Sequence, residues 1–265
     1  MMLDFFNSLD PMIAALLATI FTWFVTLLGA SLVYFFKSVN KNLMDGMLGF
    51  AAGIMIAASF FSLLMPAQEM AEGLNMTVWL VLVLGFISGG ILLFIGDKVF
   101  EHFYKKNENS SSMKRILMLI FSITLHNIPE GLAVGVAFGS IAYGLDGATM
   151  GSALVLALGI GIQNFPEGAI ISMPLKEEGT SKAKAFLFGT LSGAVEPLGA
   201  LLTILLTKLV VPVLPYLLSF AAGAMIYVVV EELIPESQSG KHSNIGTIGV
   251  ALGFVLMMIL DVALG

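Results

Sequence analysis

Apolar runs of about 20 residues recur along the whole chain, and they constrain its fold more than any other feature. Hydrophobic residues make up 58% of the 265 residues and charged residues only 11%, whereas soluble domains carry about 25% charged residues. A helix needs about 20 apolar residues to cross ~30 Å of hydrocarbon. The sequence therefore predicts an all-α, polytopic membrane protein with eight transmembrane helices in one domain, 1–265. The spans are expected at residues 11–36, 43–65, 76–100, 115–142, 147–174, 183–208, 212–235 and 244–264.

The basic residues are distributed unevenly between the predicted loops. Eleven of the twelve lie in or beside the loops that follow the first, third, fifth and seventh spans, and only Lys208 lies on the other side. Because cytoplasmic loops are enriched in Lys and Arg, both termini are expected outside the cytoplasm and the loop 101–114 inside it. The expected location is a plasma membrane, in a bacterium the inner membrane. The charge bias also supports the count of eight, since a wrong count would scatter the charges between the two sides.

A six-residue pattern occurs twice, as HNIPEG at 126–131 and as QNFPEG at 163–168, each time within an apolar span. Ionisable residues at membrane depth are costly, rare and usually functional. Residues three and four apart share one face of a helix, so each copy presents three ligand-type side chains together. These are His126, Asn127 and Glu130 in the first copy and Gln163, Asn164 and Glu167 in the second. The proline of each copy frees a backbone carbonyl, which is tolerated at membrane depth where it lines a cavity.

Five glutamates lie within the predicted spans, and no basic residue lies near them to form a pair. Glu130 and Glu167 belong to the repeated motif, Glu196 lies in the sixth span, and Glu231 and Glu232 lie near the inner end of the seventh. A charge at the centre of the bilayer costs roughly 2.5 to 3.5 kcal/mol on insertion scales. Uncompensated carboxylates must bind protons or metal cations, so the site is predicted to take a cation.

The candidate ligands are of mixed chemistry: an imidazole, amide oxygens, carboxylates and the thioether of Met55 as an additional donor. This combination suits Zn²⁺, Cd²⁺, Fe²⁺ or Mn²⁺ better than Cu⁺, and it is softer than the usual sites for Ca²⁺ and Mg²⁺. Two opposed helices with these donors could hold one or two divalent ions near the midplane.

A second repeat connects the second and seventh predicted spans. Residues Phe50–Ile56 read FAAGIMI and residues Phe220–Ile226 read FAAGAMI, and a proline follows each, Pro66 and Pro235. By the charge bias these two spans run in opposite directions. Inverted repeats with polar or proline-interrupted helices at matching places are typical of transporters. A chance likeness of two Ala/Gly-rich spans is the alternative, since small residues mediate close packing of membrane helices.

The motif pair and its setting resemble the ZIP (Zrt/Irt-like) metal transporters, especially their bacterial GufA-like branch. The likeness rests on HNIPEG in the fourth of eight spans, QNFPEG in the fifth, Glu196 in the sixth, and Glu231-Glu232 before Pro235. It implies uptake of divalent transition metals, above all zinc, into the cytoplasm through a 3+2+3 inverted arrangement with elevator-like alternating access. The metal would then be the transported substrate, the chain would need no cofactor, and a homodimer is suggested.

The resemblance also implies two neighbouring metal sites. The first would consist of His126, Glu130, Gln163 and Glu167, with Met55 as a further ligand. The second would consist of Asn127, Glu130, Asn164, Glu167 and Glu196, with Glu130 and Glu167 bridging. Gln163 and Asn164 are neutral where some relatives have histidine or aspartate, which lowers the charge of the site. Glu231, at a place where relatives have histidine, and Glu232 are candidates for a cytoplasmic exit site.

Other functions are less consistent with the residues. A proton-coupled transporter of an organic cation, with the carboxylates as proton relays, is the main alternative, and it predicts that the protein binds no metal. A membrane-embedded metalloenzyme is disfavoured because the sequence has no HExxH pair and no hydroxyl or basic nucleophile beside the motifs. No basic patch for nucleic acid is present. We therefore expect a transporter rather than an enzyme, with metal ions and lipid as its partners.

Overall fold

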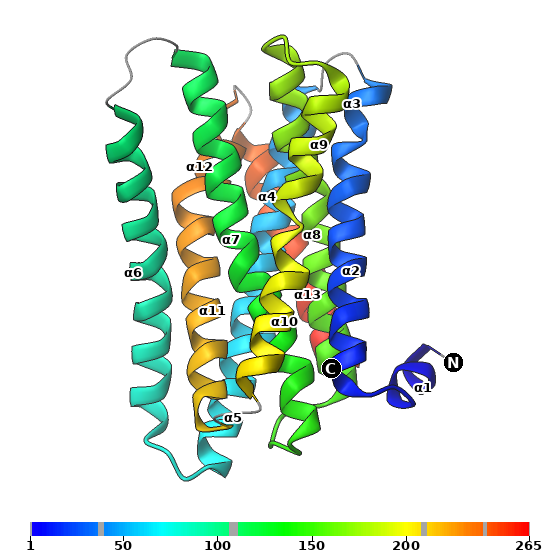
Figure 1. Cartoon of the computed structure of the whole chain (residues 1–265), viewed down its shortest axis with the longest axis vertical. Coiled ribbons are helices and arrows are strands. Elements are labelled where there is room, and N and C mark those ends of the chain that lie inside the picture. Colours follow the sequence, from blue (N-terminus) through cyan, green and yellow to red (C-terminus); the bar gives the residue numbers. More distant parts are fainter. Residues whose placement is uncertain (1, 37–39, 106–110, 208–210, 241–242, 265) are drawn as a thin grey trace.

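The chain folds into a bundle of helices that stand side by side (Figure 1). The computed structural model describes residues 2–36, 40–105, 111–207, 211–240 and 243–264, and every regular element in this part is helical. This confirms the predicted all-α class for the described residues. The elements are α1 (Met2–Asn7), α2 (Pro11–Ala30), α3 (Leu32–Phe35), α4 (Lys41–Ala58), η1 (Ser59–Leu64), α5 (Met65–Gly73), α6 (Val78–Lys105), α7 (Ser111–Ala142), α8 (Met150–Glu177), α9 (Lys182–Ser192), α10 (Val195–Thr207), η2 (Val211–Val213), α11 (Leu214–Val228), η3 (Val229–Leu233), α12 (Ile234–Ser237) and α13 (Ser243–Leu264).

Seven helical stretches of the described residues are long and apolar enough to cross a membrane. They are Pro11–Phe35, Lys41–Gly73, Val78–Val99, Met150–Glu177, Lys182–Thr203, Val211–Ser237 and Asn244–Leu264. Helix α7, which contains the fourth predicted span, is 32 residues long and stands among them (Figure 1). Several of its side chains lie outside the described residues, so the count of eight spans stays a prediction.

Two predicted boundaries differ from the structure. The second span was expected to end near residue 65, but the helical stretch continues to Gly73. The predicted loop 101–114 is helical at both ends, since α6 continues to Lys105 and α7 begins at Ser111. A helix satisfies its own backbone hydrogen bonds and need not end where the apolar residues end, because polar side chains can project from its last turns. Hydropathy therefore underestimates the length of such helices.

Prolines and glycines interrupt three of the long helices in different ways. Pro66 is the second residue of α5 and Pro235 the second of α12, and each follows a π-helical segment, η1 or η3. Single π-helical turns inside α-helices frequently mark functional sites. The sixth predicted span is broken outright between α9 and α10, because Pro197 has no N–H to donate to the carbonyl of Gly193. The prolines of the repeated motif, by contrast, lie inside continuous helices.

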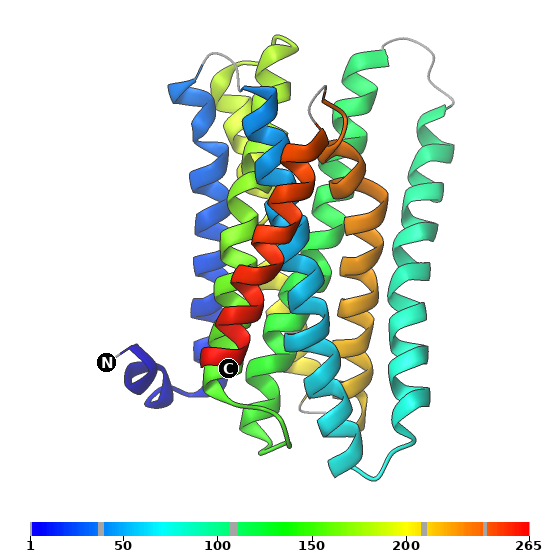
Figure 2. The same cartoon turned by 180° about the vertical axis from the view of Figure 1, so that it is seen from behind.

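The two motif-bearing helices run antiparallel, and α8 lies at the centre of the bundle (Figures 1 and 2). Of its most apolar 18 residues, 78% are buried inside the protein, against 17% for α13 at the periphery. Helix α2 packs against α8, α10 against α7, α4 against α13 and α6 against α11. The two ends of the chain lie at the same end of the bundle. The buried centre formed by α7, α8, α2 and α10 is where the polar residues of the motif gather.

Candidate metal site

The described residues of the motif are completely buried, which is unusual for carboxylates and amides. Asn127, Glu130, Gln163, Asn164, Glu167 and Glu196 all have 0% exposure. His126 lies within helix α7, but its side chain is outside the described residues, so its predicted role as a ligand stays a prediction. The structure thus brings polar groups from α7, α8 and α10 into the interior of the bundle, where each needs a partner.

A hydrogen bond connects the two copies of the motif across the antiparallel helices. The amide Nε2 of Gln163 in α8 donates to Oε1 of Glu130 in α7. The equivalent residues of the two copies, His126 and Gln163, differ in chemistry, but an imidazole N–H and an amide N–H can each donate to a carboxylate. The bond leaves Oε1 of Gln163 and Oε2 of Glu130 as acceptors.

Glu196 is held by two donors from other helices. Nδ2 of Asn164 donates to Oε1 of Glu196 at 2.8 Å, and the hydroxyl of Thr22 in α2 donates to Oε2. Both oxygens of this carboxylate therefore accept a hydrogen bond. The carboxylates of Glu130 and Glu167 lie near enough to that of Glu196 to repel it, so the acidic groups belong to one electrostatic site.

The two asparagines of the motif use their N–H groups on the backbone of neighbouring helices. Nδ2 of Asn127 donates to the carbonyl of Ser192 at 3.0 Å, where the break between α9 and α10 frees that carbonyl. Nδ2 of Asn164 lies 3.3 Å from the carbonyl of Thr22 in α2. These bonds determine the orientation of both amides, because only the amide nitrogen can donate. Each Oδ1 is left as a free acceptor.

Six buried oxygen atoms of the motif residues lack a hydrogen-bond partner in the described part of the chain. They are Oδ1 of Asn127, Oε2 of Glu130, Oε1 of Gln163, Oδ1 of Asn164 and both carboxylate oxygens of Glu167. All six are acceptors, and an unsatisfied buried acceptor costs about 1–3 kcal/mol, with more for a charged group. A cation satisfies several such oxygens at once, and carboxylate and amide oxygens are suitable ligands for divalent metals.

The glycine of each motif copy is required by a close approach of the next helix. A Cβ on Gly131 would overlap the backbone of Glu196, and a Cβ on Gly168 would overlap the carbonyl of Thr26. The PEG sequence thus combines a buried carboxylate with the small residue that lets α10 or α2 pass directly beside it. This packing brings Glu196 and Thr22 to the site.

Three further predicted ligands, Met55, Glu231 and Glu232, lie outside the two motif helices. Met55 is completely buried in α4, and its role as a ligand stays a prediction. Glu231 is exposed and Glu232 partly buried, both in η3. They lie near Asp97 and Tyr227, whose hydroxyl donates to Oδ2 of Asp97 at 2.9 Å. Glu232 also lies near enough to Glu167 for their charges to interact, so this group of acids is electrostatically connected to the motif.

The described side chains of the types His, Cys, Asp and Glu do not form a complete metal site by themselves, and that of His126 is not among them. No three of their side chains lie close enough together to hold a metal ion among the residues that the structure describes. The unpartnered amide oxygens of Asn127, Gln163 and Asn164 are further acceptors beside these carboxylates.

Sequence reasoning missed Thr22 and Ser192, which hold the asparagines and Glu196. A signal was present in α2, where Thr19, Thr22 and Thr26 follow one another at spacings of three and four in an otherwise apolar helix. All three are completely buried. Such a spacing places them on one face. For Ser192 the only indication was the Ser-Gly pair before the break.

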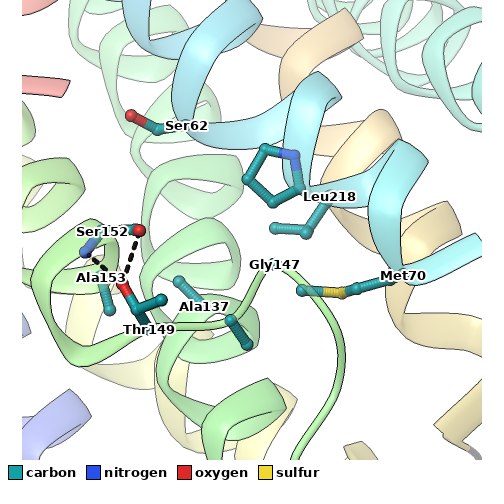
Figure 3. A pocket seen from close by; sticks show the side chains of 10 residues that line it. Ser62, Met70, Ala137, Gly147, Thr149, Ser152, Ala153 and Leu218 are labelled. Atoms are coloured by element: carbon teal, nitrogen blue, oxygen red, sulfur yellow. Dashed lines mark hydrogen bonds between the residues drawn. The ribbon is translucent and has the colours of Figure 1, made fainter. Parts of the chain in front are cut away.

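A small pocket lies between α5, α7, α8 and α11 on the side of the bundle where the termini lie (Figure 3). Its lining includes Ser62, Met70, Ala137 and Ser152, and the hydroxyl of Ser62 donates to Asp261 at 2.6 Å. Ala137 is seven residues beyond Glu130, which corresponds to about 10 Å along α7. The pocket thus lies about two helical turns from the motif, toward that end of the bundle.

The long apolar helices indicate a membrane protein. The buried acceptor oxygens without partners at its centre indicate a site for a cation, as in a membrane transport protein. A model of the ZIP zinc transporter family matches residues 9–116 and 109–261 of the chain. The chain therefore belongs to the ZIP zinc transporter family, which confirms the resemblance of the motif pair.

Individual relatives agree with this assignment. The zinc transporter ZIP11 of Xenopus tropicalis is 38% identical, over 98% of this chain and 99% of its own length. The zinc transporter GufA of Myxococcus xanthus is 36% identical, over 95% of this chain and 99% of its own length. The zinc transporter ZIPB of Bordetella bronchiseptica is 36% identical, over 91% of this chain and 78% of its own length. Family membership confirms that the chain is a membrane transporter and not an enzyme, with the metal as substrate rather than cofactor.

Proposed function

We propose that the chain moves divalent transition-metal cations, zinc above all and also Cd²⁺, Fe²⁺ and Mn²⁺, through a midplane site between α7 and α8. The main observation is the set of six buried acceptor oxygens in the two motifs, which lack donors in the described part of the chain. Relatives over nearly the whole length of the chain are named zinc transporters. The organic-cation alternative has no such support.

Two neighbouring positions for metal are part of the proposal. Glu130, Gln163 and Glu167, with His126, would form the first, and the asparagines Asn127 and Asn164 would contribute to the second with the two motif glutamates and Glu196. The hydrogen bond between Gln163 and Glu130 supports the first grouping, and the bond between Asn164 and Glu196 supports the second. Both oxygens of Glu167 are unpartnered, as a bridging ligand requires.

Transport into the cytoplasm is proposed from the placement of charge. The described lysines Lys41, Lys98, Lys176, Lys182 and Lys184 lie toward one end of the bundle, and the termini lie at the other (Figure 1). Cytoplasmic ends of membrane helices are enriched in lysine and arginine. Both termini would then face outward in the plasma membrane, with the pocket of Figure 3 on the outer side. A homodimer is a further proposal, tested by cross-linking in the membrane.

An inverted 3+2+3 arrangement is supported by matching contacts in the two halves. The sequence TLLGA at 26–30 in α2 corresponds to EPLGA at 196–200 in α10. A Cβ on Gly29 would overlap the carbonyl of Phe165, and a Cβ on Gly199 would crowd the carbonyl of Ile128, its counterpart in the other motif copy. Matching π-helical segments, η1 and η3, follow the two FAAG sequences in α4 and α11, which run in opposite directions.

Elevator-like alternating access is part of the proposal, and the pairing of the helices supports it. The helices that carry the site, α2, α7, α8 and α10, pack with one another, while α4 pairs with α13 and α6 with α11. We propose that the first group slides as a unit against the second. The site would then stay intact while its exposure changes from one side of the membrane to the other.

Uptake of labelled zinc and cadmium into proteoliposomes tests the function. We expect wild-type protein to transport both ions, and Glu130→Ala and Glu167→Ala to abolish uptake. Glu177→Ala is the matched control, since Glu177 is exposed at the end of α8 and should leave uptake unchanged. Unchanged uptake in both motif variants would contradict the proposed site, and lack of any metal uptake by wild type would contradict the function.

A further inference from the structure

Three threonines of α2 are completely buried on one face, but only one of them donates across to the site. The hydroxyl of Thr19 lies 3.0 Å from the carbonyl of Ala15, and that of Thr26 lies 3.4 Å from the carbonyl of Thr22. Bonds of this kind to the preceding turn are the ordinary way in which a membrane helix satisfies a threonine. They assign no function to Thr19 or Thr26.

Thr22 differs because one of the two acceptors within reach of its hydroxyl lies in another helix. One is the carbonyl of Thr19 in its own helix, at 3.0 Å, and the other is the nearer Oε2 of Glu196 in α10. A hydroxyl has a single proton, and a hydrogen bond to a carboxylate is about twice as strong as one to a neutral acceptor. The proton of Thr22 therefore goes to Glu196.

The backbone carbonyl of Thr22 is also connected to Glu196, through the amide of Asn164. It lies 3.3 Å from Nδ2 of Asn164, and the same Nδ2 donates to Oε1 of Glu196 at 2.8 Å. Thr22, Asn164 and Glu196 thus form a closed triangle of hydrogen bonds that joins α2, α8 and α10. Oδ1 of Asn164 is the acceptor left over from this triangle.

We propose that Thr22 is a positioning residue of the metal site, whose hydroxyl holds the carboxylate of Glu196 and, through Glu196, the amide of Asn164. The inference rests on the proposed function and adds to it a residue of α2, which lies outside both motifs. Because the Nδ2 of Asn164 donates to Glu196, the Oδ1 of Asn164 is the atom that would face the cation. Partners that orient a metal ligand typically contribute 10–100-fold to metal affinity.

Three variants of buried threonines separate this role from plain packing. Thr22→Val keeps the shape of the side chain and removes the hydroxyl, Thr22→Ser keeps the hydroxyl, and Thr19→Val removes a hydroxyl that bonds only within its own helix. We measure the Kd for zinc by calorimetry in detergent, and KM and Vmax for zinc uptake in proteoliposomes. Thermal unfolding of each variant shows that the protein is folded.

The expected result is a rise of about tenfold or more in Kd and KM for Thr22→Val, with little change in Vmax. Thr22→Ser should return both constants close to the wild-type values, and Thr19→Val should leave them unchanged. Equal effects of Thr22→Val and Thr19→Val, or a failure of Thr22→Ser to restore affinity, would overturn the assignment.

A double-mutant cycle with Glu196→Gln tests whether Thr22 acts through Glu196. Residues of one hydrogen-bond network show non-additive effects, so Thr22→Val should change the Kd for zinc little in the Glu196→Gln background. A full additive loss there would contradict the proposal. If Glu130→Ala and Glu167→Ala abolish uptake while Thr22→Val is silent, only this inference fails. If wild type itself takes up no zinc, the proposed function fails.

Discussion

In α7 the motif glycine packs against the backbone of Glu196, and in α8 the equivalent glycine packs against the carbonyl of Thr26. The asparagines show the same correspondence, since Asn127 donates to the carbonyl of Ser192 in α9 and Asn164 lies within reach of the carbonyl of Thr22 in α2. The two copies of the motif thus have equivalent backbone surroundings. Each is a ligand-bearing helix with a second helix passing directly beside its glycine.

The side chains around the two copies are not equivalent. An acid, Glu196, stands beside the first copy, and Thr26 occupies the corresponding position beside the second. Glu130 gives one oxygen to Gln163, whereas both oxygens of Glu167 are unpartnered. The backbone of the two copies is therefore nearly symmetric. The site is asymmetric because a few polar side chains differ between equivalent positions.

The largest expected difference concerns the two motif glutamates. In Glu167→Gln the side chain loses the charge shared by its two free oxygens. Loss of a residue that only orients a metal ligand raises the Kd by up to ~100-fold, so loss of a direct ligand should raise the Kd for zinc by at least that much. Glu130→Gln should raise it less, because one oxygen of Glu130 is already bonded to Gln163. Calorimetry on the two purified variants measures the difference. Equal losses in both variants would show that the two copies contribute alike.

Acidification should weaken zinc binding through the same carboxylates. Metal ligands must be deprotonated, so protons compete with zinc for Glu130, Glu167 and the imidazole of His126. The Kd should rise as the pH falls from 7 to 5, by about tenfold or more when one proton is displaced per ion. Titrations across this range, with the ionic strength held constant, check the sign. A constant Kd would exclude carboxylates and imidazole as ligands.

Much of this architecture could be predicted from the sequence, because hydropathy and the doubled motif depend on local composition. The positions of seven spans agree with the prediction to within a few residues, apart from the extension of the second to Gly73. Tertiary contacts were not accessible in this way. The role of Thr22 depends on which helix passes beside Gly168, and a buried threonine in an apolar helix normally bonds only to its own preceding turn.

The two motif glycines should be equally intolerant of a side chain. Gly131→Ala and Gly168→Ala place a methyl group against backbone atoms of α10 and α2, and overpacking typically costs about 1–3 kcal/mol. We expect a lower unfolding temperature for both variants. Gly90→Ala is the control, because a Cβ on Gly90 would lie 3.8 Å from its nearest neighbour, the carbonyl oxygen of Gly223. Thermal unfolding in detergent measures the shifts. A large shift in only one motif variant would show that the repeat is not symmetric in its packing.

The smallest expected effect distinguishes the two asparagines. Both would donate an oxygen to the metal, but Asn164 also bonds Glu196, whereas Asn127 holds only the carbonyl of Ser192. A hydrogen bond to a charged group contributes about 1.5–3 kcal/mol and a neutral one about 0.5–1.5 kcal/mol. Asn164→Ala should therefore raise the KM for zinc uptake several-fold more than Asn127→Ala. In the Glu196→Gln background the two alanine variants should become alike, because the charged partner that separates the two copies is then absent. If the KM values of the two alanine variants still differ in that background, the difference arises from contacts with α2 rather than from Glu196.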